Sequence, residues 1–190
     1  MNGKIIILSA PSGTGKSTII SRIIDDPELR LGFSISATSR APRGQERDGV
    51  EYYFITTDEF KARVERGEFV EWEEVYAGTC YGTLRSEVER VTSSGHNLIM
   101  DIDVKGGLNV KRAYGERALA IFILPPSREE LERRLRGRGT ETEERLLARL
   151  AKADYEMSFA DSYDCRVIND DIDRASAEVG QLIRDFIARD

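Results

Sequence analysis

A glycine-rich segment near the start of the chain has the residue types that bind phosphate. It consists of Ala10, Pro11, Ser12, Gly13, Thr14, Gly15, Lys16 and Ser17. The phosphate-loop pattern is G-x-x-x-x-G-K-[ST], and the segment departs from it at Ala10, where a small residue can still make the turn if φ is negative. The two glycines let backbone N–H groups close around phosphate, Lys16 supplies charge, and the Ser17 hydroxyl suits Mg²⁺. The segment therefore predicts a nucleoside-triphosphate site.

A second group with possible chemistry is the acidic pair Asp101 and Asp103, at the end of an apolar run over residues 98–102. Ligands of parallel sheets collect at the carboxyl ends of the strands. A carboxylate at that edge can hold Mg²⁺ through water, as the corresponding Asp does in other phosphate-loop enzymes. The sequence leaves open which of the two acids faces the metal.

The charge composition contains an unusual arginine excess. The net charge is −6, which excludes a generally basic nucleic-acid coat but allows a local anion site. Of the 28 cationic side chains, 22 are Arg and 6 are Lys. Because Arg grips phosphate with a two-pronged fork, the excess indicates either an anion site or a general preference for Arg in this genome.

The elements that must position these residues follow from the hydrophobic pattern. Apolar runs over residues 4–9, 98–102, 118–124 and 166–168 predict buried parallel strands. Helices are expected after the glycine-rich segment, around residues 84–95, from the capping boxes at Ser127–Glu130 and Thr140–Glu143, and over residues 179–187. The fold class expected is α/β, with a phosphate-loop parallel sheet covered by helices.

Residues 33–83 have a different pattern. Short alternating segments, at residues 33–37, 50–54 and 69–75, predict a small mixed sheet that is partly exposed. A helix is expected over residues 58–66, ended by Gly67. We therefore expect this region to be an insertion into the parallel core.

Size and composition limit the architecture. A chain of 190 residues with 40% hydrophobic content suits one globular domain. Its two cysteines form neither a metal motif nor a disulfide framework, and no apolar stretch approaches the 18 residues of a membrane span. We expect a cytoplasmic protein with neither nucleic-acid nor membrane partners, as a monomer or a homo-oligomer.

Taken in order, further motifs make the chain similar to the guanylate kinases, which are nucleoside-monophosphate kinases. The segments that carry the resemblance are Ala10–Thr18, Ser36–Arg43, Gly49–Phe54, Glu71–Trp72, Tyr81–Thr83, Asp101–Asp103, Gly137–Thr140 and Asn169–Asp171. The resemblance implies Mg²⁺-dependent transfer of the ATP γ-phosphoryl group to GMP, with dGMP as a second candidate acceptor, in purine nucleotide recycling. It divides the domain 1–190 into a core (1–32, 84–126 and 160–190), a GMP-binding insertion (about 33–83) and a lid (about 127–159).

For the acceptor, the resemblance implies contacts with both ends of GMP. Arg40, Arg43, Tyr52 and Tyr81 would bind its phosphate, which suits their forked and hydroxyl donors. Guanine would be bound by Ser36, Glu71, Thr83 and one of the acids Asp101 and Asp103, with Glu46 in support of the arginines. A carboxylate such as Glu71 can accept from both N1–H and N2–H of guanine, which adenine cannot match.

For the donor, the resemblance implies that the segment extended to Thr18 binds ATP, with Ser17 and Asp101 toward Mg²⁺. Within an arginine-rich stretch, Arg134, Arg138 and Arg149 would reach phosphate or stack on adenine, and with Lys16 and Arg40 they are the expected catalytic residues. Asn169 would face adenine. A charge run of this kind is usually a solvated helix face, and we expect this for Arg133, Arg136 and Arg145.

Two other functions fit the same fold. One is a catalytically silent peptide-binding module, which would typically have a degraded phosphate loop. The other is a kinase acting on a different phosphorylated acceptor, such as a sugar phosphate, which would lack the predicted guanine-binding residues.

Overall fold

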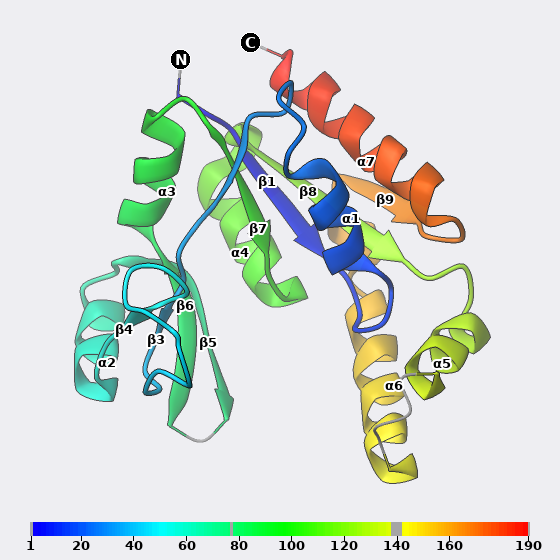
Figure 1. Cartoon of the computed structure of the whole chain (residues 1–190), viewed down its shortest axis with the longest axis horizontal. Coiled ribbons are helices and arrows are strands. Elements are labelled where there is room, and N and C mark those ends of the chain that lie inside the picture. Colours follow the sequence, from blue (N-terminus) through cyan, green and yellow to red (C-terminus); the bar gives the residue numbers. More distant parts are fainter. Residues whose placement is uncertain (1, 77, 138–141, 190) are drawn as a thin grey trace.

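The central sheet is built from β1 (Ile5–Ser9), β2 (Leu31–Phe33), β7 (Asn97–Asp101), β8 (Ala118–Leu124) and β9 (Cys165–Ile168). The computed structural model describes residues 2–76, 78–137 and 142–189. The five strands of the central sheet are all parallel, in the order β2-β7-β1-β8-β9 (Figure 1). Because β1 is central, the loop that follows it opens at the middle of the sheet's carboxyl edge.

The two faces of this sheet are covered by different helices. The helices are α1 (Lys16–Ile23), α3 (Arg85–Ser93), α4 (Val104–Tyr114) and α7 (Ile172–Ile187). Ile6 and Leu8 of β1 pack in the cluster that contains α1 and α7, whereas Ile5 and Ile7 pack in the cluster that contains α3 and α4. All residues of β1 are buried, and each large apolar side chain of this kind contributes about 1.5–3 kcal/mol by leaving water.

A second sheet lies to one side of the central sheet (Figure 1). Its strands are β3 (Ala37–Thr38), β4 (Tyr53–Phe54), β5 (Phe69–Tyr76) and β6 (Thr79–Leu84), in the order β4-β3-β6-β5. The sheet is mixed, since β3 and β4 are parallel while β6 runs antiparallel to β3 and β5. Helix α2 (Thr57–Glu65) covers it through Phe60, whose ring stacks on Phe69 at 4.4 Å.

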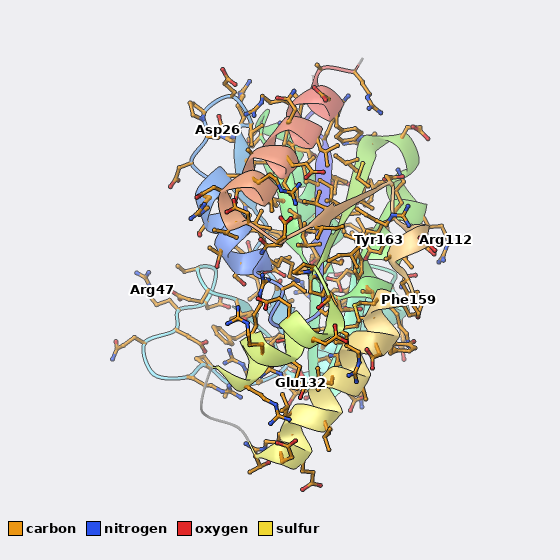
Figure 2. All side chains as sticks on the ribbon, turned by 90° about the vertical axis from the view of Figure 1, so that its right-hand side faces the viewer. Asp26, Arg47, Arg112, Glu132, Phe159 and Tyr163 are labelled. Carbon is orange, nitrogen blue, oxygen red and sulfur yellow. The ribbon has the colours of Figure 1, made fainter. Side chains whose placement is uncertain are left out.

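Helices α5 (Arg128–Arg136) and α6 (Glu143–Met157) project from the carboxyl edge of the central sheet, on the side opposite the second sheet (Figure 1). They share a small core of Leu131, Leu135, Leu146, Leu150 and Ala153. Figure 2 shows Glu132 on α5 beside α6, with Phe159 and Tyr163 where the chain returns toward the central sheet. Two 3₁₀ turns, Gly115–Arg117 and Ala160–Ser162, complete the described elements, and among the described residues no helix is both long and apolar enough to cross a membrane.

The expected α/β class, with its parallel sheet and mixed second sheet, is confirmed. The single strand expected at residues 33–37 is wrong, because Leu31–Phe33 joins the central sheet and Ala37–Thr38 joins the second. The capping box at Thr140–Glu143 is also wrong, because the N-cap of α6 is Thr142, whose side chain accepts from the Arg145 N–H. Thr140 itself lies outside the described residues.

Helix α4 was not expected from the sequence. Gly106 and Gly107 disfavour a helix by propensity, but there is no room at Gly107 for a side chain. A Cβ there would lie 2.5 Å from Tyr163 Oη and 2.9 Å from Ser9 Oγ. Close packing of α4 on the sheet therefore requires the glycine that weakens its sequence signal.

Candidate active site

The loop between β1 and α1 surrounds a cavity of about 410 Å³ at the carboxyl edge of the sheet. The cavity is lined by Ala10, Pro11, Ser12, Gly13, Thr14, Gly15, Lys16, Ser17 and Thr18, together with Asp101, Ile102, Asp103 and Glu156. Gly13 and Gly15 both have φ +94°, which L side chains rarely adopt. Among the described non-glycine residues, Arg30 alone has a positive φ. The φ of Ala10 is therefore negative, and Ala10 makes the turn without a glycine, as expected. The loop is therefore shaped to present backbone N–H groups to an anion.

Asn169, predicted to face adenine, also supports this loop from behind. Its side chain is 3% exposed and its Nδ2 donates to the Thr14 carbonyl at 2.6 Å. A Cβ on Gly15 would collide with the same Nδ2 atom. The loop conformation thus depends on a residue that follows β9, far away in the sequence.

Lys16 and Asp101 form an ion pair inside the cavity. Asp101 ends β7, which lies beside β1 in register Leu8↔Asp101, so the parallel pairing brings this carboxylate to the loop. Ser17 lines the same cavity, so a hydroxyl and a carboxylate oxygen face the phosphate site together. Such an oxygen-only set suits Mg²⁺, which keeps several waters and is held largely by substrate phosphates.

Asp103 is placed differently from Asp101. It is the N-cap of α4, and its Oδ1 accepts from the N–H groups of Lys105 at 2.8 Å and Gly106 at 3.1 Å. The pKa of Glu71 is raised mainly by burial and further by the charge of Asp103. Asp101 is therefore the acid paired with Lys16, while Asp103 is the acid beside Glu71.

A second cavity, of about 240 Å³, adjoins the first. It is lined by Ser36, Tyr52, Glu71, Glu73, Tyr81, Gly82, Asp101, Ile102 and Asp103. The segment Asp101–Asp103 lines both cavities, so the end of β7 is their common wall. Most of the residues predicted to bind an acceptor thus come together next to the phosphate loop.

Arg40 is held rigidly at one end of the second cavity. Glu46 accepts from both terminal nitrogens of Arg40, at 2.6 and 2.8 Å, and the Tyr81 hydroxyl lies 3.0 Å from Arg40 Nε. Hydrogen bonds from Arg40 and from the backbone N–H of Arg43 together lower the pKa of Glu46 from 4.5 to about 2. The guanidinium also lies 5.0 Å from the Tyr52 ring centre. Arg43 itself is exposed.

Glu71 lies at the other end, on β5. It is 8% exposed and accepts from the Thr83 hydroxyl at 2.7 Å. Its second oxygen reaches α4, because a Cβ on Gly106 would lie 3.2 Å from Glu71 Oε2. Thr83 is 1% exposed, so its hydroxyl supports Glu71 from behind the cavity wall. Its predicted contact with guanine remains a prediction.

Two of the predicted lid arginines lie beside the phosphate loop. Arg134 donates to Glu130 at 2.7 Å and to the Asn169 carbonyl at 3.0 Å, and it lines a cavity of about 440 Å³ with Gly13, Gly15 and Asn169–Ile172. Arg149 donates to Ser12 Oγ. Arg138 lies outside the described residues. Arg133 and Arg136 form ion pairs on helix surfaces, with Glu130 and with Glu132 and Glu143, as expected for a solvated face.

Sequence reasoning missed two carboxylates of the site. Glu73 could have been found, because it lies two residues after Glu71 on an alternating strand and so shares its face. Glu156 of α6 is 8% exposed and lines the phosphate-loop cavity. Its sequence context is an ordinary amphipathic helix, which contains no signal for this position.

Comparisons of the sequence with known proteins point to one family. A family model described as guanylate kinase matches residues 2–186. A guanylate kinase of Bacteroides thetaiotaomicron is 53% identical over 190 residues, covering 100% of this chain and 93% of the relative. One of Porphyromonas gingivalis is 54% identical over 186 residues, covering 98% of this chain and 99% of the relative.

Solved structures show the same likeness. The crystal structure of guanylate kinase from Anaplasma phagocytophilum matches with a TM-score of 0.72 at 30% identity, covering 99% of this chain and 88% of that chain. The SH3-kinase fragment of tight junction protein 3 has a TM-score of 0.52 at 10% identity, covering 99% of this chain and 59% of that chain. The second match shows the fold alone.

Proposed function

Because the chain belongs to the guanylate kinase family and is an ATP:GMP phosphotransferase, we propose that the phosphoryl group is transferred between the two adjoining cavities, beside their shared lining segment Asp101–Asp103. The observation that carries this proposal is that one three-residue segment lines both the phosphate-loop cavity and the acceptor cavity. Donor and acceptor phosphates bound on either side of it would be close neighbours. Holding two reactants in this way supplies much of the rate enhancement of phosphoryl transfer.

On the donor side, the backbone N–H groups of residues 10–18 bind the ATP phosphates, and Lys16 neutralises charge that develops during transfer. Arg134 and Arg149 approach the same phosphates from α5 and α6, and Arg138 belongs to the same predicted set. The cavity beside Arg134 and Asn169 receives adenine. Each of these groups stabilises negative charge or holds the nucleotide in place, so the protein need not supply a general base.

Ser17 and Asp101 are the residues that would hold Mg²⁺ at the donor phosphates. The cation supplies charge neutralisation at the phosphate oxygens when it is bound. Asp101 is ion-paired with Lys16, so the carboxylate also keeps the lysine ammonium directed into the phosphate cavity.

On the acceptor side, Arg40, Arg43, Tyr52 and Tyr81 bind the phosphate of GMP. Glu46 orients Arg40 by its two-pronged contact, which leaves the remaining donors of the arginine directed at substrate. At the other end of the cavity Glu71, Ser36 and Asp103 bind guanine, and Thr83 acts with them through its bond to Glu71. A buried acceptor such as Glu71 selects guanine because adenine has no donors to satisfy it.

The three-part division into core (1–32, 84–126 and 160–190), GMP-binding insertion (about 33–83) and lid (about 127–159) belongs to the same proposal. Closure of the lid over ATP would exclude water and prevent hydrolysis. The enzyme is proposed to act in the cytoplasm on free nucleotides, as a monomer or a homo-oligomer.

Acceptor profiling tests the proposal directly. ADP release from ATP and Mg²⁺ is measured with GMP, dGMP, AMP and ribose 5-phosphate in parallel. GMP, and to a lesser degree dGMP, should give turnover, whereas AMP and ribose 5-phosphate should give little above background. Preferential turnover of a sugar phosphate would indicate a kinase with another acceptor. Absence of turnover with every acceptor would indicate a binding module.

A further inference from the structure

Glu73 is one of the residues that line the acceptor cavity. It lies two residues after Glu71 on β5, so both side chains are on the same face of the second sheet. In the pairing of β5 with β6, Glu71 is opposite Thr83 and Glu73 is opposite Tyr81. Both carboxylates line the acceptor cavity, whereas Glu74 lies on the other face, where it accepts from the Gly78 N–H at 2.7 Å.

The cavity has two chemically different ends. Tyr81 contacts Arg40 at 3.0 Å, so this end is rich in donors that suit a phosphate. Glu71 at the other end is an acceptor that suits the N–H groups of a base. In a nucleoside monophosphate the ribose connects the phosphate to the base. A substrate bound across these two ends therefore places its ribose along the stretch of β5 that carries Glu73.

The charges around Glu73 suit a hydroxyl donor. Partial burial, the charge of the neighbouring Asp103 carboxylate and a hydrogen bond with it raise the pKa of Glu73, while the ammonium groups of Lys152 on α6 and Lys105 on α4 lower it. An ionised carboxylate offers acceptors only, and the protonated form still has an acceptor oxygen. Ribose hydroxyls are the neutral donors that a nucleotide presents between its base and its phosphate.

We propose that Glu73 accepts a hydrogen bond from a ribose hydroxyl of the acceptor nucleotide and so makes the enzyme prefer GMP to dGMP. The inference rests on the proposed function, because it needs the phosphate at Arg40 and the base at Glu71. It assigns a substrate contact to a residue whose side chain is exposed and lines the acceptor cavity.

The test compares kcat/KM for GMP and dGMP in the full-length enzyme and in Glu73→Ala, Glu73→Gln and Glu74→Gln. A hydrogen bond to a charged group corresponds to roughly 10- to 100-fold in affinity, and the low end applies at an exposed position. Glu73→Ala should therefore lower kcat/KM for GMP about tenfold and leave that for dGMP nearly unchanged. Glu73→Gln keeps one acceptor oxygen and should give an intermediate ratio. Glu74→Gln, with the same charge change on the opposite face, should retain the wild-type ratio.

Three results would overturn the inference. One is an unchanged GMP to dGMP ratio in Glu73→Ala. Another is an equal loss for both nucleotides, which is the signature of a structural or purely electrostatic role. The third is a wild-type enzyme that does not discriminate between them. Failure of the proposed function is a separate outcome, since it would appear as no turnover of either nucleotide by the wild-type enzyme.

A binding measurement separates this contact from effects on catalysis. Isothermal titration of GMP, dGMP and 3′-deoxy-GMP into wild-type and Glu73→Ala enzyme should show the loss of affinity only for nucleotides that have the contacted hydroxyl. The affinity of dGMP, which lacks the 2′-hydroxyl, should be insensitive to the substitution, whereas insensitivity of 3′-deoxy-GMP alone would contradict the proposal. Equal affinity losses for all three nucleotides would contradict the proposal.

Discussion

Lys16, the first residue of α1, is ion-paired with Asp101, the last residue of β7. All of residues 33–83, the proposed GMP-binding insertion, lies between these two residues in the sequence, and the parallel pairing of β1 with β7 brings them together. The pair joins the phosphate loop to the wall that both cavities share. It therefore links the donor and acceptor halves of the site.

Lys16→Ala should lower kcat for GDP formation by a factor on the order of 10³, because it removes a cation from a site where negative charge develops. A coupled ADP-release assay measures the change. Lys61→Ala, which removes an exposed lysine of α2, is the matched control and should retain full activity. Wild-type turnover by Lys16→Ala would show that this loop is not the donor site.

Glu71→Ala should lower kcat/KM for GMP about a hundredfold, since the guanine N–H groups lose their charged acceptor, and should leave the KM for ATP within about a factor of two. Steady-state kinetics with each nucleotide varied in turn distinguishes the two effects. Glu74→Ala controls for the loss of a carboxylate from the same strand. A loss confined to ATP would place Glu71 on the donor side.

The Arg40–Glu46 contact makes a defined contribution to the pH dependence of stability. The pKa of Glu46 is about 2 in the folded chain and 4.5 in its ordinary state, so the folded chain binds this proton less readily. The stabilisation is therefore complete above about pH 4.5 and is lost as the pH falls toward 2. Thermal unfolding from pH 3 to pH 8 should show a Tm difference between wild type and Glu46→Gln that is constant above pH 5 and shrinks in acid.

This pH prediction has its own control. Glu51→Gln changes another carboxylate of the same loop, one that accepts from the backbone N–H of Arg47. The two variants should differ in activity, because Glu46→Gln also frees Arg40 and should raise the KM for GMP. A Tm difference for Glu46→Gln that grows below pH 4 would contradict the assignment.

Asn169→Ala should raise the KM for ATP about tenfold and lower the stability of the protein. It leaves the Thr14 carbonyl without its donor and opens a small cavity behind Gly15, which costs about 1–3 kcal/mol. Asn109→Ala, on the exposed face of α4, is the matched control and should change neither property. An Asn169→Ala enzyme with normal stability and a normal KM for ATP would show that the loop holds its shape without this bond.

The local elements could be predicted where one signal was dominant. The buried run of β1, the glycine-rich loop and the capping box at Ser127–Glu130 all correspond to observed elements. Helix α4 was missed because its two glycines have poor helix propensity, although one of them, Gly107, is required for the close approach to Tyr163 and Ser9. Tertiary packing outweighs local propensity at that position, and no local pattern can indicate it.

The candidate site was predictable as a set of residues but not as an arrangement. Motif chemistry selected the phosphate loop and the two aspartates, and the family resemblance selected Arg40 and Glu71. Only the structure separates Asp101, which pairs with Lys16, from Asp103, which caps α4 beside Glu71. Their sequence contexts are nearly the same, and the difference arises because the strand ends between them and the chain turns into a helix.

The amino-acid sequence by itself determined the chemistry available to this protein, because the phosphate loop, the arginines and the carboxylates are properties of residue type and spacing. Tertiary structure alone decided which of these groups share a cavity. Thr83 holds Glu71 across the neighbouring strands β5 and β6. Asn169 reaches the loop from much later in the chain, and Glu71 and Glu73 of the second sheet share a cavity with Asp101–Asp103 of the central sheet. Such pairings depend on long-range packing, which local sequence does not encode.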